Sequence, residues 1–116
     1  MKISEIRDLL DAELLCGREH LDYDVESACC SDMMSDVLAC VTEDTLLLTG
    51  LVNGQSVRTC EMLDVPCVVF VRDKEPLADA VALAREIGLP ALKTPYTMFE
   101  ACAKLYMAGL RPVELG

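Results

Sequence analysis

The chain has 116 residues, 53% of them hydrophobic, which suits one domain with an aliphatic core and excludes a two-domain enzyme. Twenty acidic residues against ten basic residues give a formal net charge of -10, and the basic residues do not cluster. Such a surface repels nucleic acid and anionic membranes. With three Tyr, two Phe and no Trp, the chain also lacks the rings that usually stack on bases.

No apolar run approaches the roughly 20 residues that a membrane span needs, and charges interrupt the first 15 residues where a signal peptide would be apolar. We therefore expect a soluble, cytoplasmic protein with one domain over residues 1–116. The seven cysteines are odd in number and most lie in apolar segments. They are interpreted as reduced thiols and not as a disulfide framework.

The first part of the chain predicts short elements. Apolar residues at helical spacing indicate a helix over 3–10, and "AELLCG" over 12–17 is typical of a short strand. Residues 25–30 alternate only in part, which favours a strand at the sheet edge. Ser31 and Asp32 are residue types that cap helices, so a helix is expected to begin after them.

Helices and strands alternate over the rest of the chain. The predicted elements are helix 33–41, strand 45–50, helix 56–63, strand 67–71, helix 77–87, strand 91–94 and helix 97–108. The strands at 45–50 and 67–71 are continuously apolar, as in a parallel sheet that is buried on both faces. The sequence therefore predicts an α/β fold with a mainly parallel five-stranded sheet and helices on both faces.

Parallel sheets bind ligands beyond the carboxyl ends of their strands. The turn "TGLVNGQS" is the most suggestive such segment, because its two Gly residues permit close backbone approach and its Ser begins a helix. The predicted ligand residues are Thr49, Gly50, Asn53, Gly54, Gln55, Ser56, Thr94 and Thr97, with Arg58 or Arg72 to offset ligand charge. The segment has no phosphate-binding motif, so an ordinary strand-to-helix turn is an equal alternative.

Metal or thiol chemistry has less support. Cys16 with His20, and the adjacent Cys29 and Cys30, could be imagined as one zinc site, but no metal-ligand spacing occurs. A catalytic cysteine would need a base, and the chain has a single His. We expect no metal and no cofactor.

The last predicted helix has apolar residues on more than one side. Its polar stripe is narrow, so one side can cover the sheet while another meets a partner. This pattern predicts a homodimer in which Phe99, Leu105, Tyr106 or Met107 contributes to the contact. The alternative is that the helix is buried among other elements of its own chain.

Three segments together, "SACCSDMMSDVLA", "LLLTGLVNGQSVRTCEMLDVPCVVFVR" and "TPYTMFEACAKLYMAGL", resemble stand-alone DRTGG-domain proteins of anaerobic bacteria. The resemblance covers nearly the whole chain. The DRTGG fold is similar to the N-terminal domain of HPr serine kinase, and related domains accompany phosphotransacetylases and CBS-containing pyrophosphatases. The resemblance implies a regulatory or ligand-sensing α/β domain.

The string DRTGG does not occur in this sequence, and the kinase's phosphate-binding loop belongs to a separate domain that these residues do not include. We therefore expect no catalytic activity. The leading hypothesis is a regulatory domain that binds a small anionic or nucleotide-like ligand, with a protein partner in a regulatory system. The alternatives are a homo-oligomeric interaction module without a small ligand, and a thiol redox or metal protein.

Overall fold

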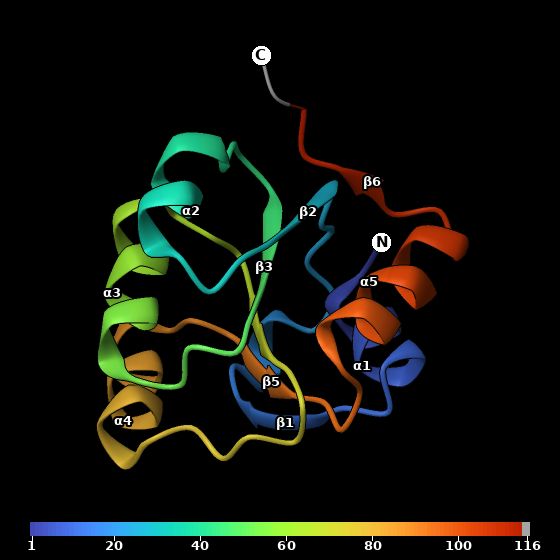
Figure 1. The fold of residues 1–116 in the computed structure, drawn as a ribbon. Coiled ribbons are helices and arrows are strands. Elements are labelled where there is room, and N and C mark those ends of the chain that lie inside the picture. Colours follow the sequence, from blue (N-terminus) through green and yellow to red (C-terminus); the bar gives the residue numbers. More distant parts are fainter. Residues whose placement is uncertain (115–116) are drawn as a thin grey trace.

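The computed structural model describes residues 1–114, in which five α-helices and six strands form an α/β fold with one mixed sheet (Figure 1). The helices are α1 (Ile3–Leu9), α2 (Met34–Cys40), α3 (Gly54–Met62), α4 (Ala78–Ile87) and α5 (Met98–Met107), with a 3-10 turn at Arg18–His20. The strands are β1 (Glu13–Cys16), β2 (Ser27–Cys30), β3 (Thr45–Thr49), β4 (Val68–Phe70), β5 (Ala91–Lys93) and β6 (Arg111–Pro112).

The strand order is β1-β5-β4-β3-β2-β6. Four of its five neighbouring pairs are parallel, and β1 runs antiparallel to β5. The predicted number of five strands was therefore wrong, because the sheet has six. The sheet is mainly parallel, as predicted, but its edge strand β1 is antiparallel. Hydrophobic periodicity marks a strand but carries no information about the direction of its neighbour, which is why β1 could not be oriented from the sequence.

The sixth strand, β6, also corrects the predicted place of β2. Residues 25–30 were expected at the sheet edge, but β6 pairs with β2 and takes that position. β6 is only two residues long and contains Pro112. A strand this short has no periodicity to detect, and proline is tolerated there because the outer edge needs no ladder donor.

Strands β3 and β4 are buried along their whole length. α1 and α5 cover one face of the sheet, whereas α2, α3 and α4 cover the other (Figure 1). Side chains alternate along β3, so Leu46 and Leu48 pack with α1 and α5 while Leu47 packs with the opposite helices. Two aliphatic cores therefore hold the central strands, as their continuous apolar runs predicted.

Local chemistry sets most helix ends. The Asn53 side chain accepts a hydrogen bond from the Gln55 amide at the start of α3, and Thr97 forms a capping box with Glu100 at the start of α5. Gly88 ends α4 with a φ of 74°, a conformation that favours glycine. These helices match their predicted ranges to within two residues.

The start of α2 differs from the prediction. Its N-cap residue is Met33, whose side chain makes no cap hydrogen bond. Ser31 instead accepts a hydrogen bond from the Met33 amide at 3.0 Å, one residue before the helix. The expected cap Asp32 is used elsewhere, at the carboxyl edge of the sheet.

The carboxyl ends of β2, β3, β4 and β5 lie along one edge because these four strands are parallel. In residues 1–114, no helix is both long and apolar enough to cross a membrane.

We predict that Leu46→Ala lowers the free energy of unfolding by about 2–5 kcal/mol, because Leu46 is fully buried in the centre of one core. Leu38→Ala is the matched control, since Leu38 lies on α2 and is 47% exposed. It should cost less than about 1 kcal/mol. Urea unfolding followed by circular dichroism measures both, and equal losses would contradict the assignment of the core.

Candidate functional site at the carboxyl edge of the sheet

A carboxylate organises the centre of this edge. The Gly50 amide, just after β3, donates a hydrogen bond of 2.6 Å to Asp32 Oδ1, and the Thr49 hydroxyl donates to the same oxygen at 3.3 Å. Asp32 comes two residues after β2, so this contact ties the ends of two neighbouring strands together. Gly50 is buried, and the Asp32 carboxylate supplies the acceptor for its amide.

Two basic side chains approach the same glycine. A Cβ atom added to Gly50 would lie 2.8 Å from Arg72 Nη2 and 3.2 Å from Asp32 Oδ1, so the missing side chain leaves room for the guanidinium. Lys74 Nζ donates to the Gly50 carbonyl oxygen at 3.3 Å. Within residues 1–114, neither Arg72 nor Lys74 forms an ion pair. Both are exposed, so their charges are available to a ligand.

The backbone that carries Arg72 is strained. Arg72 and Asp73 follow β4 with φ angles of 64° and 54°, in the left-handed region that non-glycine residues seldom occupy. The Arg72 amide donates to the Tyr96 carbonyl at 2.7 Å, and the Asp73 amide donates to the Thr94 carbonyl at 2.9 Å. The loop after β5 therefore holds this turn in place, and such held strain is common at functional sites.

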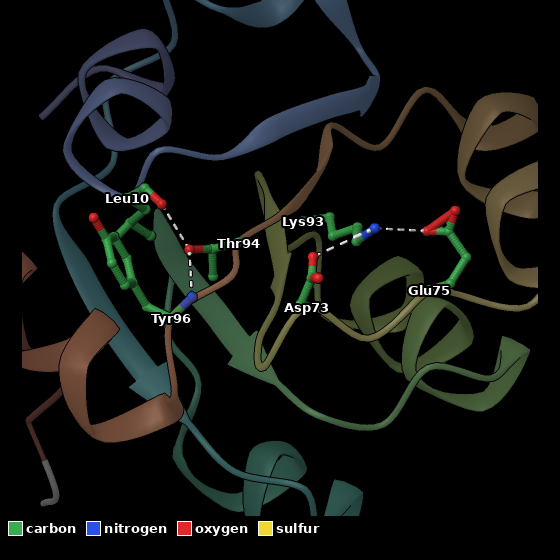
Figure 2. Close-up of polar contacts among 6 residues, drawn as sticks. All are labelled: Leu10, Asp73, Glu75, Lys93, Thr94 and Tyr96. Atoms are coloured by element: carbon green, nitrogen blue, oxygen red, sulfur yellow. Dashed lines mark hydrogen bonds and ion pairs between the residues drawn. The ribbon is translucent and has the colours of Figure 1, made fainter.

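A third basic residue at this edge is already neutralised. Lys93 Nζ lies 3.2 Å from Glu75 Oε2 and 3.5 Å from Asp73 Oδ1 (Figure 2). The hydrogen bond with Glu75, followed by the charges of both carboxylates, raises the pKa of Lys93. Lys93 is therefore a poor candidate for ligand binding, although it ends a central strand.

The Thr94 side chain holds the end of β5 in place through hydrogen bonds. Its hydroxyl donates to the Leu10 carbonyl at 2.6 Å and accepts a hydrogen bond from the Tyr96 amide at 3.3 Å (Figure 2). Thr94 is fully buried, and its contact with Leu10 joins the end of β5 to the segment after α1. Lys104 on α5 lies above the Tyr96 ring, 4.8 Å from its centroid, a distance at which cation–π attraction acts.

The start of α3 is less open to an anion than its sequence indicated. Asn53 caps the helix, and the buried Ser56 hydroxyl donates to the Asn53 carbonyl at 2.9 Å. A Cβ atom on Gly54 would lie 3.5 Å from an Asp79 carboxylate oxygen of α4. Asp79 therefore already supplies negative charge beside this helix N-terminus.

The two predicted arginines have different surroundings. Arg58 lies one turn inside α3, where its Nη1 atom is 3.3 Å from Glu61 Oε1. Arg72 lies beside Gly50 with no such partner in the described part of the chain. The structure thus brings Gly50 and Arg72 together. Asn53, Ser56 and Thr97 make local hydrogen bonds at helix starts, and Thr94 bonds to the distant Leu10. Gln55 is exposed on α3, and Thr49 donates to Asp32.

Sequence reasoning missed two residues of this cluster. Asp32 was expected to follow a strand and cap a helix but was not included among the predicted ligand residues, and Lys74 was not singled out. The signal for Asp32 is its place directly after a strand, but its partner could be named only with the strand order β4-β3-β2 in hand. Lys74 lies in the loop between β4 and α4, and no local sequence pattern predicts its contact with Gly50.

A separate cavity of about 340 Å³ lies between α5 and the edge formed by β2 and β6. Its lining is mostly apolar and consists of Ala28, Cys29, Cys30, Leu48, Phe99, Cys102, Ala103, Leu105, Tyr106, Leu110, Arg111 and Pro112. Its volume falls in the range of small-molecule pockets.

Three of the four residues predicted for a contact between chains are exposed on α5. Phe99 is 83% exposed, Tyr106 65% and Met107 85%. Leu105 is 1% exposed and packs in the core beneath α5. Leu105 is therefore removed from the predicted contact, because it lies on the side of the helix that covers the sheet.

All seven thiols are free. Burial raises the pKa of Cys16 and Cys29, raises that of Cys60 to about 12, and raises that of the fully buried Cys67 further. His20 and Cys16 form no site with Cys29 and Cys30: among residues 1–114, no group of three or more His, Cys, Asp or Glu side chains could hold a metal ion.

No family model and no curated protein matches this chain. A solved structure of the CBS and DRTGG domains from the regulatory region of Clostridium perfringens pyrophosphatase, complexed with its activator diadenosine tetraphosphate, is similar in fold. The TM-score is 0.74 at 14% sequence identity, over 98% of this chain and 48% of the other. The chain thus has the fold of part of a pyrophosphatase regulatory region. The resemblance to the HPr kinase domain stays a prediction.

We predict that Asp32→Ala lowers the free energy of unfolding by about 1–3 kcal/mol, because it leaves the buried Gly50 amide without its acceptor. Asp22→Ala is the control, since Asp22 is an exposed turn residue. It should change the free energy by less than about 0.5 kcal/mol. Hydrogen exchange of the Gly50 amide provides a local measurement. Unchanged protection in Asp32→Ala would rule out the bond.

Proposed function

We propose that this chain is a non-catalytic regulatory domain that senses a small anionic, nucleotide-like ligand at the carboxyl edge of its sheet. The observation that carries the proposal is the Arg72 guanidinium beside Gly50, with Lys74 on the same glycine. These two charges, together with a backbone that lacks a side chain, make the chemistry that binds phosphate oxygens.

The distribution of charge favours an anion at this position over the rest of the surface. The chain carries a net charge of -10, so an anion is repelled by most of the surface. At the edge, Lys93 is paired with Glu75 and Asp73, and Arg58 with Glu61, whereas Arg72 and Lys74 keep their charge toward solvent. A polyanion therefore finds its favourable partners at Arg72 and Lys74, with Asp32 as the opposing charge that limits affinity.

The structural neighbour supports a sensing role. It is a regulatory region, and its activator is a nucleotide polyphosphate. The fold alone does not transfer that ligand to this chain, so the class of ligand rests on the charges at the edge. The sequence has no phosphate-binding loop motif, and residues 1–114 hold no group of three or more His, Cys, Asp or Glu side chains that could bind a metal ion. Phosphoryl transfer depends on such groups, so these observations support a binding function without a reaction.

We expect Arg72→Gln to weaken the binding of ATP and diadenosine tetraphosphate by about tenfold or more, because a charge-assisted hydrogen bond contributes roughly 1.5–3 kcal/mol. Titration calorimetry at about 0.15 M salt measures the affinity, and inorganic tripolyphosphate tests whether phosphate alone suffices.

Arg18→Gln is the matched control, since Arg18 is an exposed arginine in the 3-10 turn after β1, at the opposite edge of the sheet. It should leave the affinity within about twofold once the change in net charge is screened by salt. If none of the three probes binds at millimolar concentration, the sensing proposal fails. If Arg72→Gln and Arg18→Gln bind equally well, the site is elsewhere.

A second proposal concerns self-association, and the exposed side of α5 favours it. Phe99, Tyr106 and Met107 are large apolar residues at high exposure on one helix. We propose that this stripe pairs two copies of the chain, because a symmetric contact uses the same surface twice and two-fold dimers are the commonest closed assembly. A protein partner in a regulatory system is the other use of such a surface.

Met107→Asp should raise the dimer dissociation constant by more than about tenfold, because a symmetric contact would bury two unpaired carboxylates. Tyr106→Asp should act in the same direction. Met62→Asp makes the same chemical change at a 72% exposed methionine of α3, on the other face of the sheet, and should leave association unchanged. Sedimentation equilibrium measures all three. A monomer at high micromolar concentration would refute the pairing.

A further inference from the structure

Two cysteines from distant parts of the sequence meet in the cavity beside β2. Cys30 is the last residue of β2 and is exposed, whereas Cys102 is a half-buried residue of α5. Both line the cavity of about 340 Å³. Each thiol is close enough to the other to shift its pKa. The end of a strand and a helix from distant parts of the chain thus present two sulfur atoms to one cavity.

The surroundings make these two thiols unequal. The side-chain contact with Cys102 lowers the pKa of the Cys30 thiol to about 6, against smaller opposing effects of burial and of Asp32. The same contact raises the pKa of Cys102, so Cys102 keeps its proton. The other ionisable or charged side chains at the cavity are Cys29 of the same strand, Tyr106 of α5 and Arg111 of β6. A thiolate and a thiol side by side are the reactants of a disulfide-forming pair.

Four of the five other thiols have a pKa that is shifted in the opposite direction to that of Cys30. Burial raises the pKa of Cys16, Cys29, Cys60 and Cys67. Cys29 also lines the cavity, which makes it the natural internal comparison. Reaction with an oxidant is therefore expected to select Cys30 among these thiols.

We propose that Cys30 and Cys102 form a peroxide-sensitive modification site, in which Cys30 is the attacking sulfur and Cys102 the resolving sulfur. The proposal is independent of the ligand site at Arg72 and of the pairing through α5.

The chemistry takes two steps. The Cys30 thiolate attacks the outer oxygen of a hydroperoxide, the O–O bond breaks, and a proton from solvent converts the leaving alkoxide into an alcohol. Cys30 is thereby oxidised by two electrons to a sulfenic acid. The Cys102 thiol then attacks this sulfur, a disulfide forms, and hydroxide leaves with the thiol proton as water. Two equivalents of a small thiol reverse the change and become a disulfide themselves.

The apolar lining favours an organic hydroperoxide over a charged oxidant, because Phe99, Tyr106 and Pro112 offer contact to an alkyl group and little to an ion. A Cys30–Cys102 bond would join α5 to β2 covalently. It would fix the helix that carries Phe99, Tyr106 and Met107 against the sheet.

The experiment uses the full chain, reduced and freed of reductant, in the Met107→Asp background so that self-association does not cover the cavity. Met107 does not line that cavity. One equivalent of cumene hydroperoxide is added, remaining thiols are blocked with N-ethylmaleimide, and linked peptides are identified by mass spectrometry. The expected product is a monomer that has lost two hydrogens through a Cys30–Cys102 bond, and that regains them with dithiothreitol.

Single substitutions separate the two roles. Cys102→Ser should stop at a sulfenic acid on Cys30, which dimedone traps. Cys30→Ser should leave Cys102 unmodified. Cys29→Ser changes the neighbouring thiol of the same cavity and should still give the Cys30–Cys102 bond. At pH 6, iodoacetamide should label Cys30 about tenfold faster than N-acetylcysteine, because its larger thiolate fraction outweighs its lower intrinsic nucleophilicity.

The proposal is overturned if the disulfide joins other cysteines or two chains, if Cys102→Ser yields no dimedone adduct on Cys30, or if Cys30 is labelled no faster than N-acetylcysteine. Circular dichroism of each variant checks that it is folded. If Cys102→Ser is unfolded, labelling of the unsubstituted chain still decides the result. None of these outcomes affects the binding of ATP to Arg72, so the two proposals succeed or fail separately.

Discussion

The burial of β3 and β4 on both faces is the constraint on which the rest of this molecule depends. Leu46, Leu47 and Leu48 alternate between two aliphatic cores, so β3 cannot slide by one residue without exchanging its two faces. Because β3 is fixed, Gly50 emerges at a defined point, and Asp32 can reach its amide. The polar contacts at the carboxyl edge are therefore a consequence of apolar packing several residues away.

The carboxyl edge carries basic side chains with different surroundings. Lys93 is paired with Asp73 and Glu75. Arg72 differs because its backbone is held in the left-handed region by hydrogen bonds to the loop after β5. The strain is maintained by the tertiary structure, and it places the guanidinium over a glycine where any other residue would bring a Cβ into contact.

The surface of the C-terminal helix α5 has three parts with different surroundings. Ala101 and Leu105 face the sheet, Phe99 and Met107 face solvent, and Cys102 borders the cavity beside β2. A helical repeat with apolar residues on several sides predicted that part of α5 would remain exposed. It could not assign Leu105 to the buried side, because that depends on the angle at which the helix lies across the sheet.

The sequence by itself determined the α/β class, the helices that end at capping residues, and the two central strands, because each follows from local periodicity and turn chemistry. It also placed Gly50 and Arg72 among the residues that follow strands. The antiparallel direction of β1, the strand β6, the contact of Asp32 with Gly50 and the meeting of Cys30 with Cys102 were decided only by the tertiary structure. The physical reason is that these contacts join segments far apart in the chain, and the order and direction of the strands, which no local pattern encodes, decide which segments meet.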